Sequence, residues 1–136
     1  MNEDIPSQGL LDTSVLIARE SGRPLDAEMI PEVSYVSVIT AAELEAGVHA
    51  ARDAAARAAR LHTWARVAEL ELLGVDLGVA HEWALLRYRL AEAGRRANVN
   101  DVWIAAIALA NGLAVVTQDD DFDVLAGIGG PQIIKV

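Results

Sequence analysis

Four acidic residues, far apart in the chain, each stand where a predicted strand ends or a predicted helix begins. Because the carboxyl ends of parallel strands and the helix starts that follow them share one edge of an α/β sheet, we expect these side chains to meet there. Like charges held close together raise one another's pKa values and destabilise the fold unless a cation lies between them. Hard divalent cations such as Mg²⁺ and Mn²⁺ prefer carboxylate oxygens, so the pattern predicts a metal site. The four residues are Asp12, Glu43, Asp101 and Asp119.

Each of these residues also has a purely structural explanation. Asp12 and Asp101 stand where helix caps or first-turn acids are common. Glu43 can complete a capping box with Thr40, and the aspartates from 119 to 123 can form a solvated turn. The metal site therefore depends on the four residues occurring together and on the elements that position them.

Strands and helices alternate along the chain, with connections long enough for parallel pairing. This order predicts an α/β fold with a mostly parallel central sheet between helices. Asn98 or Asn100 is expected to cap the buried helix expected at 102–110. Expected strands cover 9–12, 34–39, 72–75, 113–117 and 132–136, and expected helices cover 15–20, 40–50, 53–73, 76–93 and 102–110, with a weakly helical stretch at 25–30.

The composition narrows the class of protein. A chain of 136 residues with 53% hydrophobic residues is expected to form one domain over 10–136, preceded by a polar tail over 1–9. The absence of cysteine excludes disulfides and thiolate metal sites, and the three histidines are scattered without ligand spacing. No long apolar run and no targeting segment are found, so a cytoplasmic location without membrane association is expected.

A net charge of −9 argues against a nucleic-acid partner, but the charges are distributed unevenly along the chain. Eight arginines face six acids between residues 52 and 96, so this segment carries +2 and the remainder −11. Most of these arginines are expected to lie on solvated helix faces. Three that could hold substrate phosphates are Arg87, Arg95 and Arg96. Trp103 could stack on a base, although a role in packing is favoured.

Three segments together resemble the PIN-domain ribonucleases, and within them the VapC toxins of bacterial toxin-antitoxin modules. They are LLDTSVLI at 10–17, VSVITAAELEAG at 36–47 and NDVWIAAIALANGLAVVTQDDDF at 100–122. The resemblance implies a PIN-like α/β/α sandwich and a Mg²⁺- or Mn²⁺-dependent endoribonuclease. It also implies a homodimer held inactive by a cognate VapB-type antitoxin, whose basic or aromatic segment crosses the acidic pocket.

The acids of that family fall on the four residues named above. The resemblance implies that Asp12, Asp101 and Asp119 hold the metal ion, while Glu43 orients the attacking water or completes a second metal site. Asp119 is preferred over its acidic neighbours because it lies closest to the strand end. Positions that match supporting residues of the family are Thr13, Ser14, Thr117 and Asp121.

Two other functions remain open from the sequence. A phosphatase with an aspartyl nucleophile at Asp12 would normally carry a second aspartate two residues later, where this chain has Ser14. A non-catalytic PIN-like module that binds RNA or protein would not need four intact acids. Divalent-ion binding and trapping of a phosphoenzyme would discriminate among the three.

Overall fold

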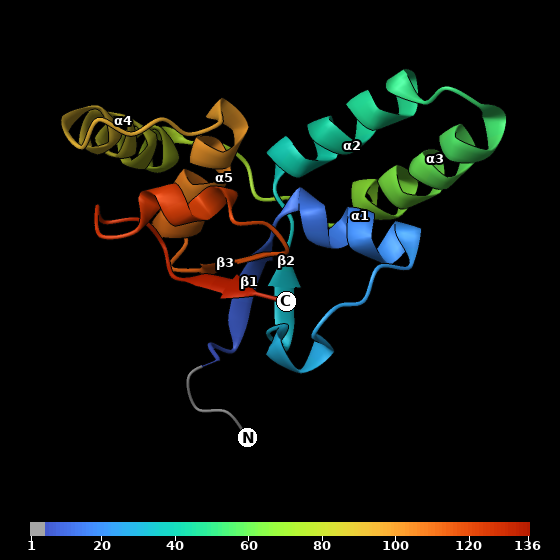
Figure 1. Cartoon of the computed structure of the whole chain (residues 1–136), viewed down its shortest axis with the longest axis horizontal. Helices are drawn as coiled ribbons and strands as arrows, with labels where there is room; N and C mark the ends of the chain where they lie inside the picture. Colours follow the sequence, from blue (N-terminus) through green and yellow to red (C-terminus); the bar gives the residue numbers. More distant parts are fainter. Residues whose placement is uncertain (1–4) are drawn as a thin grey trace.

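The computed structural model describes residues 5–136 and shows a sheet of four parallel strands between two layers of helices (Figure 1). The strand order is β2-β1-β3-β4, and all three pairings are parallel. The predicted mostly parallel α/β/α sandwich is therefore confirmed. The strands are β1 (Gln8–Leu11), β2 (Val33–Tyr35), β3 (Ala114–Thr117) and β4 (Ile133–Lys135).

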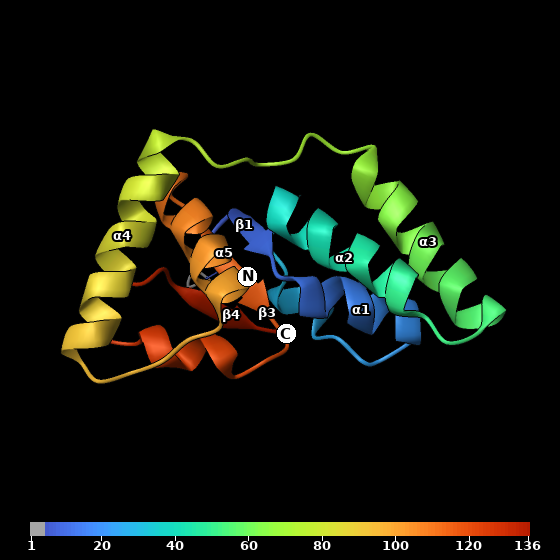
Figure 2. The same cartoon turned by 90° about the horizontal axis from the view of Figure 1, so that it is seen from above.

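Five helices cover the two faces of this sheet. The group α1, α2 and α3 lies on one side and the pair α4 and α5 on the other, as the view from above shows (Figure 2). Two short 3-10 helices complete the fold. The bounds are α1 (Thr13–Ser21), α2 (Val38–Ala50), α3 (Ala54–Ala68), α4 (Leu77–Glu92), α5 (Val99–Ala110), η1 (Ala27–Met29) and η2 (Asp121–Leu125).

Alternation along the two central strands feeds two separate cores. Leu10 and Val115 point to the core under α4 and α5, whereas Leu11 and Val116 point to the core under α1, α2 and α3. Successive strand residues face opposite sides of a sheet, so a run of apolar residues is required where both sides are covered. The apolar α5, which the sequence predicts as buried, provides most of the first core.

The register places the ends of β1 and β3 side by side. Leu11 pairs with Val116, so the residues that follow, Asp12 and Thr117, are neighbours at the carboxyl edge. The Asp12 N–H donates to the Val116 carbonyl at 2.8 Å. The chain leaves β1 and β3 toward opposite faces of the sheet, which leaves a crevice at this edge.

Two expected elements are wrong, and both errors lie around Leu73. The expected strand at 72–75 is an isolated bridge between Ser37 and Leu73, because β2 has already ended at Tyr35. The expected helix at 53–73 ends at Ala68, since the chain must extend to reach that bridge. The segment at 25–30 contains only the 3-10 helix η1.

Helix starts also differ from the expectation at two of the site elements. Asp12 caps α1, which begins at Thr13, and Ser37 caps α2, which begins at Val38 rather than at residue 40. Glu43 therefore lies in the second turn of α2, outside any capping box with Thr40. β1 begins at Gln8, inside the range expected as a tail, and residues 1–4 of that tail lie outside the described residues.

Candidate functional site

A pocket of about 340 Å³ lies at the carboxyl edge of β1 and β3. Five carboxylates from four separate parts of the chain line it, together with a single arginine, Arg23. All four acids expected to meet there do so, and Asp121 of η2 joins them. The carboxylates belong to Asp12, Glu43, Asp101, Asp119 and Asp121.

Asp12 is the most firmly held of the five. Its side chain is 4% exposed, and Oδ2 accepts hydrogen bonds from Ser14 Oγ at 2.7 Å and from Thr117 Oγ1 at 2.9 Å. Within residues 5–136, Oδ1 accepts no hydrogen bond. A buried carboxylate with one oxygen fixed and the other uncommitted is an oriented ligand.

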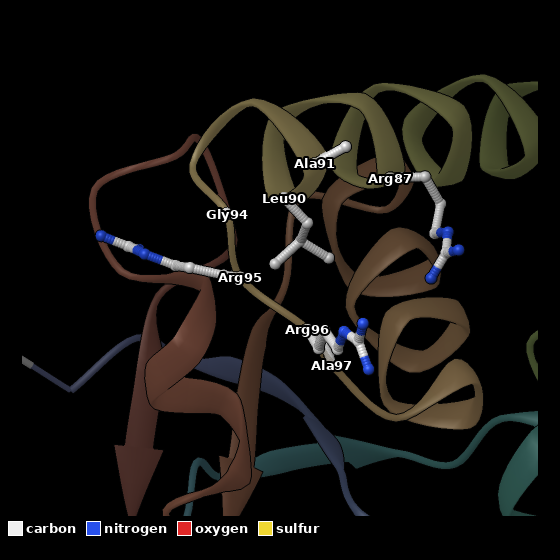
Figure 3. Close-up of a pocket in the computed structure, with 7 residues that line it drawn as sticks. All are labelled: Arg87, Leu90, Ala91, Gly94, Arg95, Arg96 and Ala97. Carbon is white, nitrogen blue, oxygen red and sulfur yellow. The ribbon is translucent and has the colours of Figure 1, made fainter.

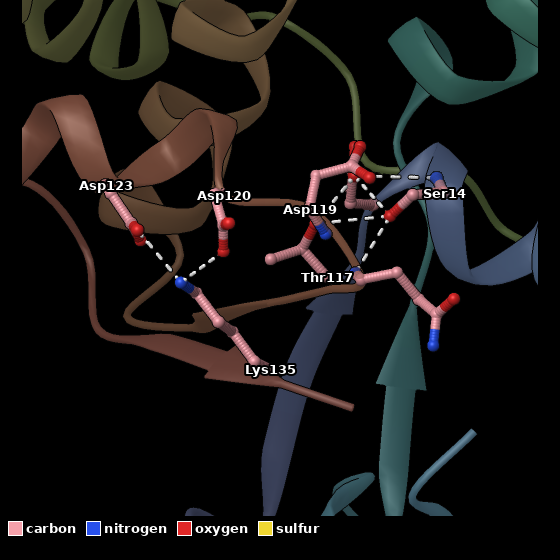
Figure 4. A network of polar contacts seen from close by, with 8 residues as sticks. Ser14, Thr117, Asp119, Asp120, Asp123 and Lys135 are labelled. Carbon is pink, nitrogen blue, oxygen red and sulfur yellow. Dashed lines mark hydrogen bonds and ion pairs between the residues drawn. The ribbon is translucent and has the colours of Figure 1, made fainter. Parts of the chain in front are cut away.

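The two hydroxyls that hold Asp12 also connect the strand ends. Ser14 Oγ lies 3.1 Å from Thr117 Oγ1 and accepts from the Gln118 N–H at 3.0 Å. Thr117, fully buried, accepts from the Asp119 N–H at 3.0 Å (Figure 4). The backbone that carries Asp119 is therefore fixed relative to Asp12 by side chains rather than by strand pairing.

Glu43 is held by the first residue of α1. Thr13 Oγ1 donates to Glu43 Oε1 at 2.8 Å and lies 3.0 Å from the hydroxyl of the buried Thr40. This contact joins α1 to α2 across 30 residues of sequence. It directs the Glu43 carboxylate to the same pocket as Asp12.

The charges of the pocket act most strongly on Asp101. Its pKa rises from 3.8 to about 7, first through burial and then through the carboxylates of Asp12, Asp121, Glu43 and Asp119, in that order of effect. Burial and the nearby acids also raise the pKa of Asp119, whereas Arg23 opposes the rise. Neither side chain accepts a hydrogen bond from residues 5–136, so within the described chain only the charge of Arg23 offsets part of the negative charge of Asp119.

The extra aspartates beside Asp119 face away from this pocket. Lys135 of β4 donates to Asp120 Oδ1 at 2.7 Å and to Asp123 Oδ2 at 2.9 Å. Figure 4 shows this pair turned toward Lys135, while Asp119 lies beside Thr117 and Ser14. The geometry therefore separates the acidic run into residues that line the pocket and residues that form ion pairs with a single lysine.

The donor set fits a hard divalent cation in its chemistry. The polar groups that line the pocket within residues 5–136 are carboxylates, hydroxyls and one amide beside one arginine. Burial and, after it, repulsion by the neighbouring carboxylates raise the pKa of Asp101, and a bound cation would relieve that repulsion. Across residues 5–136, no group of three or more Asp, Glu, His or Cys side chains is converged closely enough to hold an ion as it stands.

Comparison with known proteins identifies the family. The family model of the PIN domain matches the sequence over residues 9–128. The chain belongs to the PIN-domain family. It is 52% identical to ribonuclease VapC5 of Mycobacterium tuberculosis, over 96% of this chain and 97% of that protein. It is also 42% identical to ribonuclease VapC4 of the same organism, over 85% and 88% of the two chains.

Solved structures agree with this membership of the PIN-domain family. The crystal structure of VapBC-5, a toxin-antitoxin system of M. tuberculosis, superposes with a TM-score of 0.89 at 49% identity, over 96% of this chain and all of that one. DNA-bound VapBC from Salmonella typhimurium superposes with a TM-score of 0.76 at 26% identity, over 94% and 97% of the chains. The sequence resemblance is thereby confirmed.

In this PIN domain the expected phosphate-binding arginines lie outside the acidic pocket. Arg87, Arg95 and Arg96 line a second pocket at the end of α4. Trp103 stacks on Trp83 with ring centroids 4.8 Å apart, which confirms the favoured role in packing between α4 and α5. No helix within residues 5–136 is both long enough and apolar enough to span a bilayer.

Besides the apolar Ile17, two polar residues of the pocket are not expected as site residues from the sequence. Arg23 follows the glycine that ends α1, between the helix expected at 15–20 and the weakly helical stretch expected at 25–30. Asn98 is expected only as a helix cap, and it does accept from the N–H groups of Asn100 and Asp101. Nothing in the spacing of either residue distinguishes it from an ordinary loop or capping residue.

Proposed function

We propose that this chain is a Mg²⁺- or Mn²⁺-dependent endoribonuclease and the toxin of a toxin-antitoxin module. The observation that supports this most directly is the meeting of five carboxylates in one pocket at the β1–β3 edge. The chain also carries high identity, over nearly its full length, to proteins named ribonuclease VapC. RNA hydrolysis is thus the chemistry assigned to the acidic pocket.

Asp12, Asp101 and Asp119 would hold the cation. A bound divalent ion lowers the pKa of water toward neutrality and stabilises the charge that develops on a phosphodiester. Asp12 supplies a fixed direction because Ser14 and Thr117 hold one of its oxygens. Among residues 5–136 no hydrogen bond holds the carboxylates of Asp101 and Asp119 in this way, so these two side chains can adjust to the ion.

Glu43 positions the attacking water in this proposal. The hydrogen bond from Thr13 occupies Oε1 and fixes the direction of the carboxylate. The other carboxylate oxygen of Glu43 can accept a hydrogen bond from the attacking water. This contact orients a lone pair of the water oxygen toward the phosphorus. Thr13, Ser14 and Thr117 act by holding carboxylates and do not touch the reacting atoms, while Asp121 adds charge at the rim.

The phosphatase alternative gains no support from the geometry. Such chemistry would place an acid two residues after Asp12, and Ser14 at that position donates its hydroxyl to Asp12 itself. Asp12 is also buried by that contact and by Thr117. The endoribonuclease is therefore retained as the proposed function.

A VapB-type antitoxin is the proposed protein partner, and a homodimer the proposed assembly. Solved relatives of this chain are described as VapBC toxin-antitoxin complexes. The acidic pocket, with five carboxylates and one arginine, would favour a cationic peptide segment. Inhibition of RNA cleavage by the antitoxin encoded beside this chain tests the partner, and light scattering of the toxin tests the dimer.

Cleavage of RNA by the purified protein tests the proposed function. We expect cleavage in Mg²⁺ or Mn²⁺ that EDTA abolishes, and a loss of about 100-fold or more in Asp101→Asn and Asp119→Asn. Asp120→Asn is the matched control, because it removes the same charge one residue away at a side chain bound by Lys135. Wild-type rates in Asp101→Asn, or equal losses in the control, would contradict the assignment.

A further inference from the structure

A second pocket, of about 520 Å³, lies between the end of α4 and the loop that leads to α5 (Figure 3). Of residues 5–136, three arginines and no acidic residue line it. We propose that this pocket binds phosphate groups of the RNA strand beside the cleaved bond, with Arg87 and Arg96 as the contacting residues. The inference rests on the proposed function and assigns a substrate subsite to it.

Two of the three guanidinium groups are uncommitted. Arg87 lies over the ring of Trp83, 5.6 Å from its centroid, which orients the side chain without neutralising it. Among residues 5–136 neither Arg87 nor Arg96 forms an ion pair. Arg60, by contrast, is paired with Glu20 at 3.3 Å. The free groups are suited to bidentate contact with phosphate oxygens.

Arg95 has a different role in the same pocket. Its Nη1 donates to the Ala126 carbonyl at 2.7 Å and to the Val124 carbonyl at 3.2 Å. Figure 3 shows its side chain extending away from the side on which Arg87 and Arg96 hold their guanidinium groups. Arg95 therefore ties the loop to the end of η2 and positions the pocket rather than binding phosphate.

The arginine pocket and the acidic pocket share a rim. Ala97 lines the first and the next residue, Asn98, lines the second. Consecutive residues are only about 3.8 Å apart between Cα atoms, so the two pockets adjoin at this loop and one strand of RNA that passes over it would reach both. At its other end η2, which Arg95 holds, begins with Asp121 of the acidic pocket.

The charge balance explains why such a subsite is needed. RNA approaching the pocket meets five carboxylates and only Arg23 in a protein of net charge −9. Phosphate binding is driven mainly by cationic contacts, so a polyanion requires positive groups close to the acidic site. Arg87 and Arg96 provide them immediately beside it.

The inference is tested by measuring the binding of a short, fluorescein-labelled single-stranded RNA of mixed sequence in EDTA. A gel verifies that this RNA stays intact. For two lost phosphate contacts, the slope of log affinity against log salt should fall by about 1.4 in the double variant Arg87→Gln/Arg96→Gln. When the salt is lowered from 1 M to 0.1 M, the affinity of this variant should therefore rise roughly 25-fold less than that of the wild type. The double variant Arg87→Lys/Arg96→Lys should keep most of the slope.

The matched control is Arg52→Gln/Arg66→Gln, which removes two exposed arginines beside α3, on the opposite side of the molecule from α4 (Figure 2). Its slope should equal that of the wild type, and thermal unfolding should show all three double variants folded. An unchanged slope in Arg87→Gln/Arg96→Gln overturns the subsite, as does an equal loss in the control. Weaker antitoxin binding with unchanged RNA binding also overturns it. Failure of the wild type to cleave RNA in Mg²⁺ would instead overturn the proposed function.

Discussion

Replacing Asp101 with asparagine should stabilise the metal-free protein while removing its activity. The raised pKa of Asp101 means that the folded state holds its proton more tightly than the unfolded state does. Between the ordinary value of 3.8 and about 7 the unfolded state therefore binds fewer protons, and the free energy of unfolding falls as the pH rises. The asparagine side chain keeps the shape of the aspartate but carries no charge, so the variant escapes this loss.

The size of the effect follows from the shift. At about 1.4 kcal/mol for each pKa unit, a shift from 3.8 to about 7 corresponds to about 4 kcal/mol above neutral pH. Asp101 is only half-buried, and screening by solvent should reduce the gain to about 1–2 kcal/mol. For a domain of this size we expect a Tm about 3–8 °C higher in Asp101→Asn.

Thermal unfolding in EDTA, followed by circular dichroism, measures this gain. The advantage of Asp101→Asn over the wild type should grow from about pH 4 to pH 7 and then stay constant. Addition of Mg²⁺ should stabilise the wild type, by about 2.7 kcal/mol at 100 times the Kd, and the variant much less. A variant less stable than the wild type near pH 8, or a difference that does not change with pH, would refute the reasoning. Asp120→Asn, whose carboxylate is bound by Lys135, is the control and should show no such gain.

Three further substitutions test how the site is held. Thr117→Val should lower the free energy of unfolding, measured in urea, by about 1–3 kcal/mol and should reduce RNA cleavage. The reason is that the buried Asp12 carboxylate and the Asp119 N–H each lose one hydrogen-bond partner. Gly9→Ala should cost about 1–3 kcal/mol in the same assay, since its Cβ would lie 2.8 Å from Pro31 Cγ and 2.9 Å from Val116 Cγ2. Arg95→Ala should cost about 1 kcal/mol and speed amide hydrogen exchange after η2, because two carbonyls lose a donor.

Each of these has its own contradicting result. Full activity in Thr117→Val would show that Asp12 needs no support from that hydroxyl. A Gly9→Ala protein as stable as the wild type would mean that the sheet and Pro31 relax around the methyl group. Unchanged exchange in Arg95→Ala would show that the loop is held by other contacts, and Arg96→Ala, which has no such carbonyl partners, is its control.

Local features of the sequence are sufficient for most of the elements. The short apolar runs of β1 and β3, the apolar α5 and the cap at Asn98 each depend on neighbours close in the chain, so their patterns can be recognised directly. The start of α2 and the bridge at Leu73 cannot, because Ser37 and Leu73 meet only after folding. The local patterns at 34–39 and at 72–75 both favour strands. They therefore do not indicate that α2 begins at Val38 or that Leu73 forms only a bridge.

The sequence by itself determined the fold class, the order of the elements apart from the strand expected at 72–75, and the four acids that the sheet gathers at one edge. Only the tertiary structure showed how Asp120 and Asp123 are kept apart from Asp121 and the acidic pocket, since Lys135 reaches these two from β4. It alone added Arg23 to the acidic pocket and distinguished the bound Arg95 from the free Arg87 and Arg96. The physical reason is that spacing along a strand or helix fixes which face a residue occupies, whereas charge compensation depends on partners brought from elsewhere in the chain.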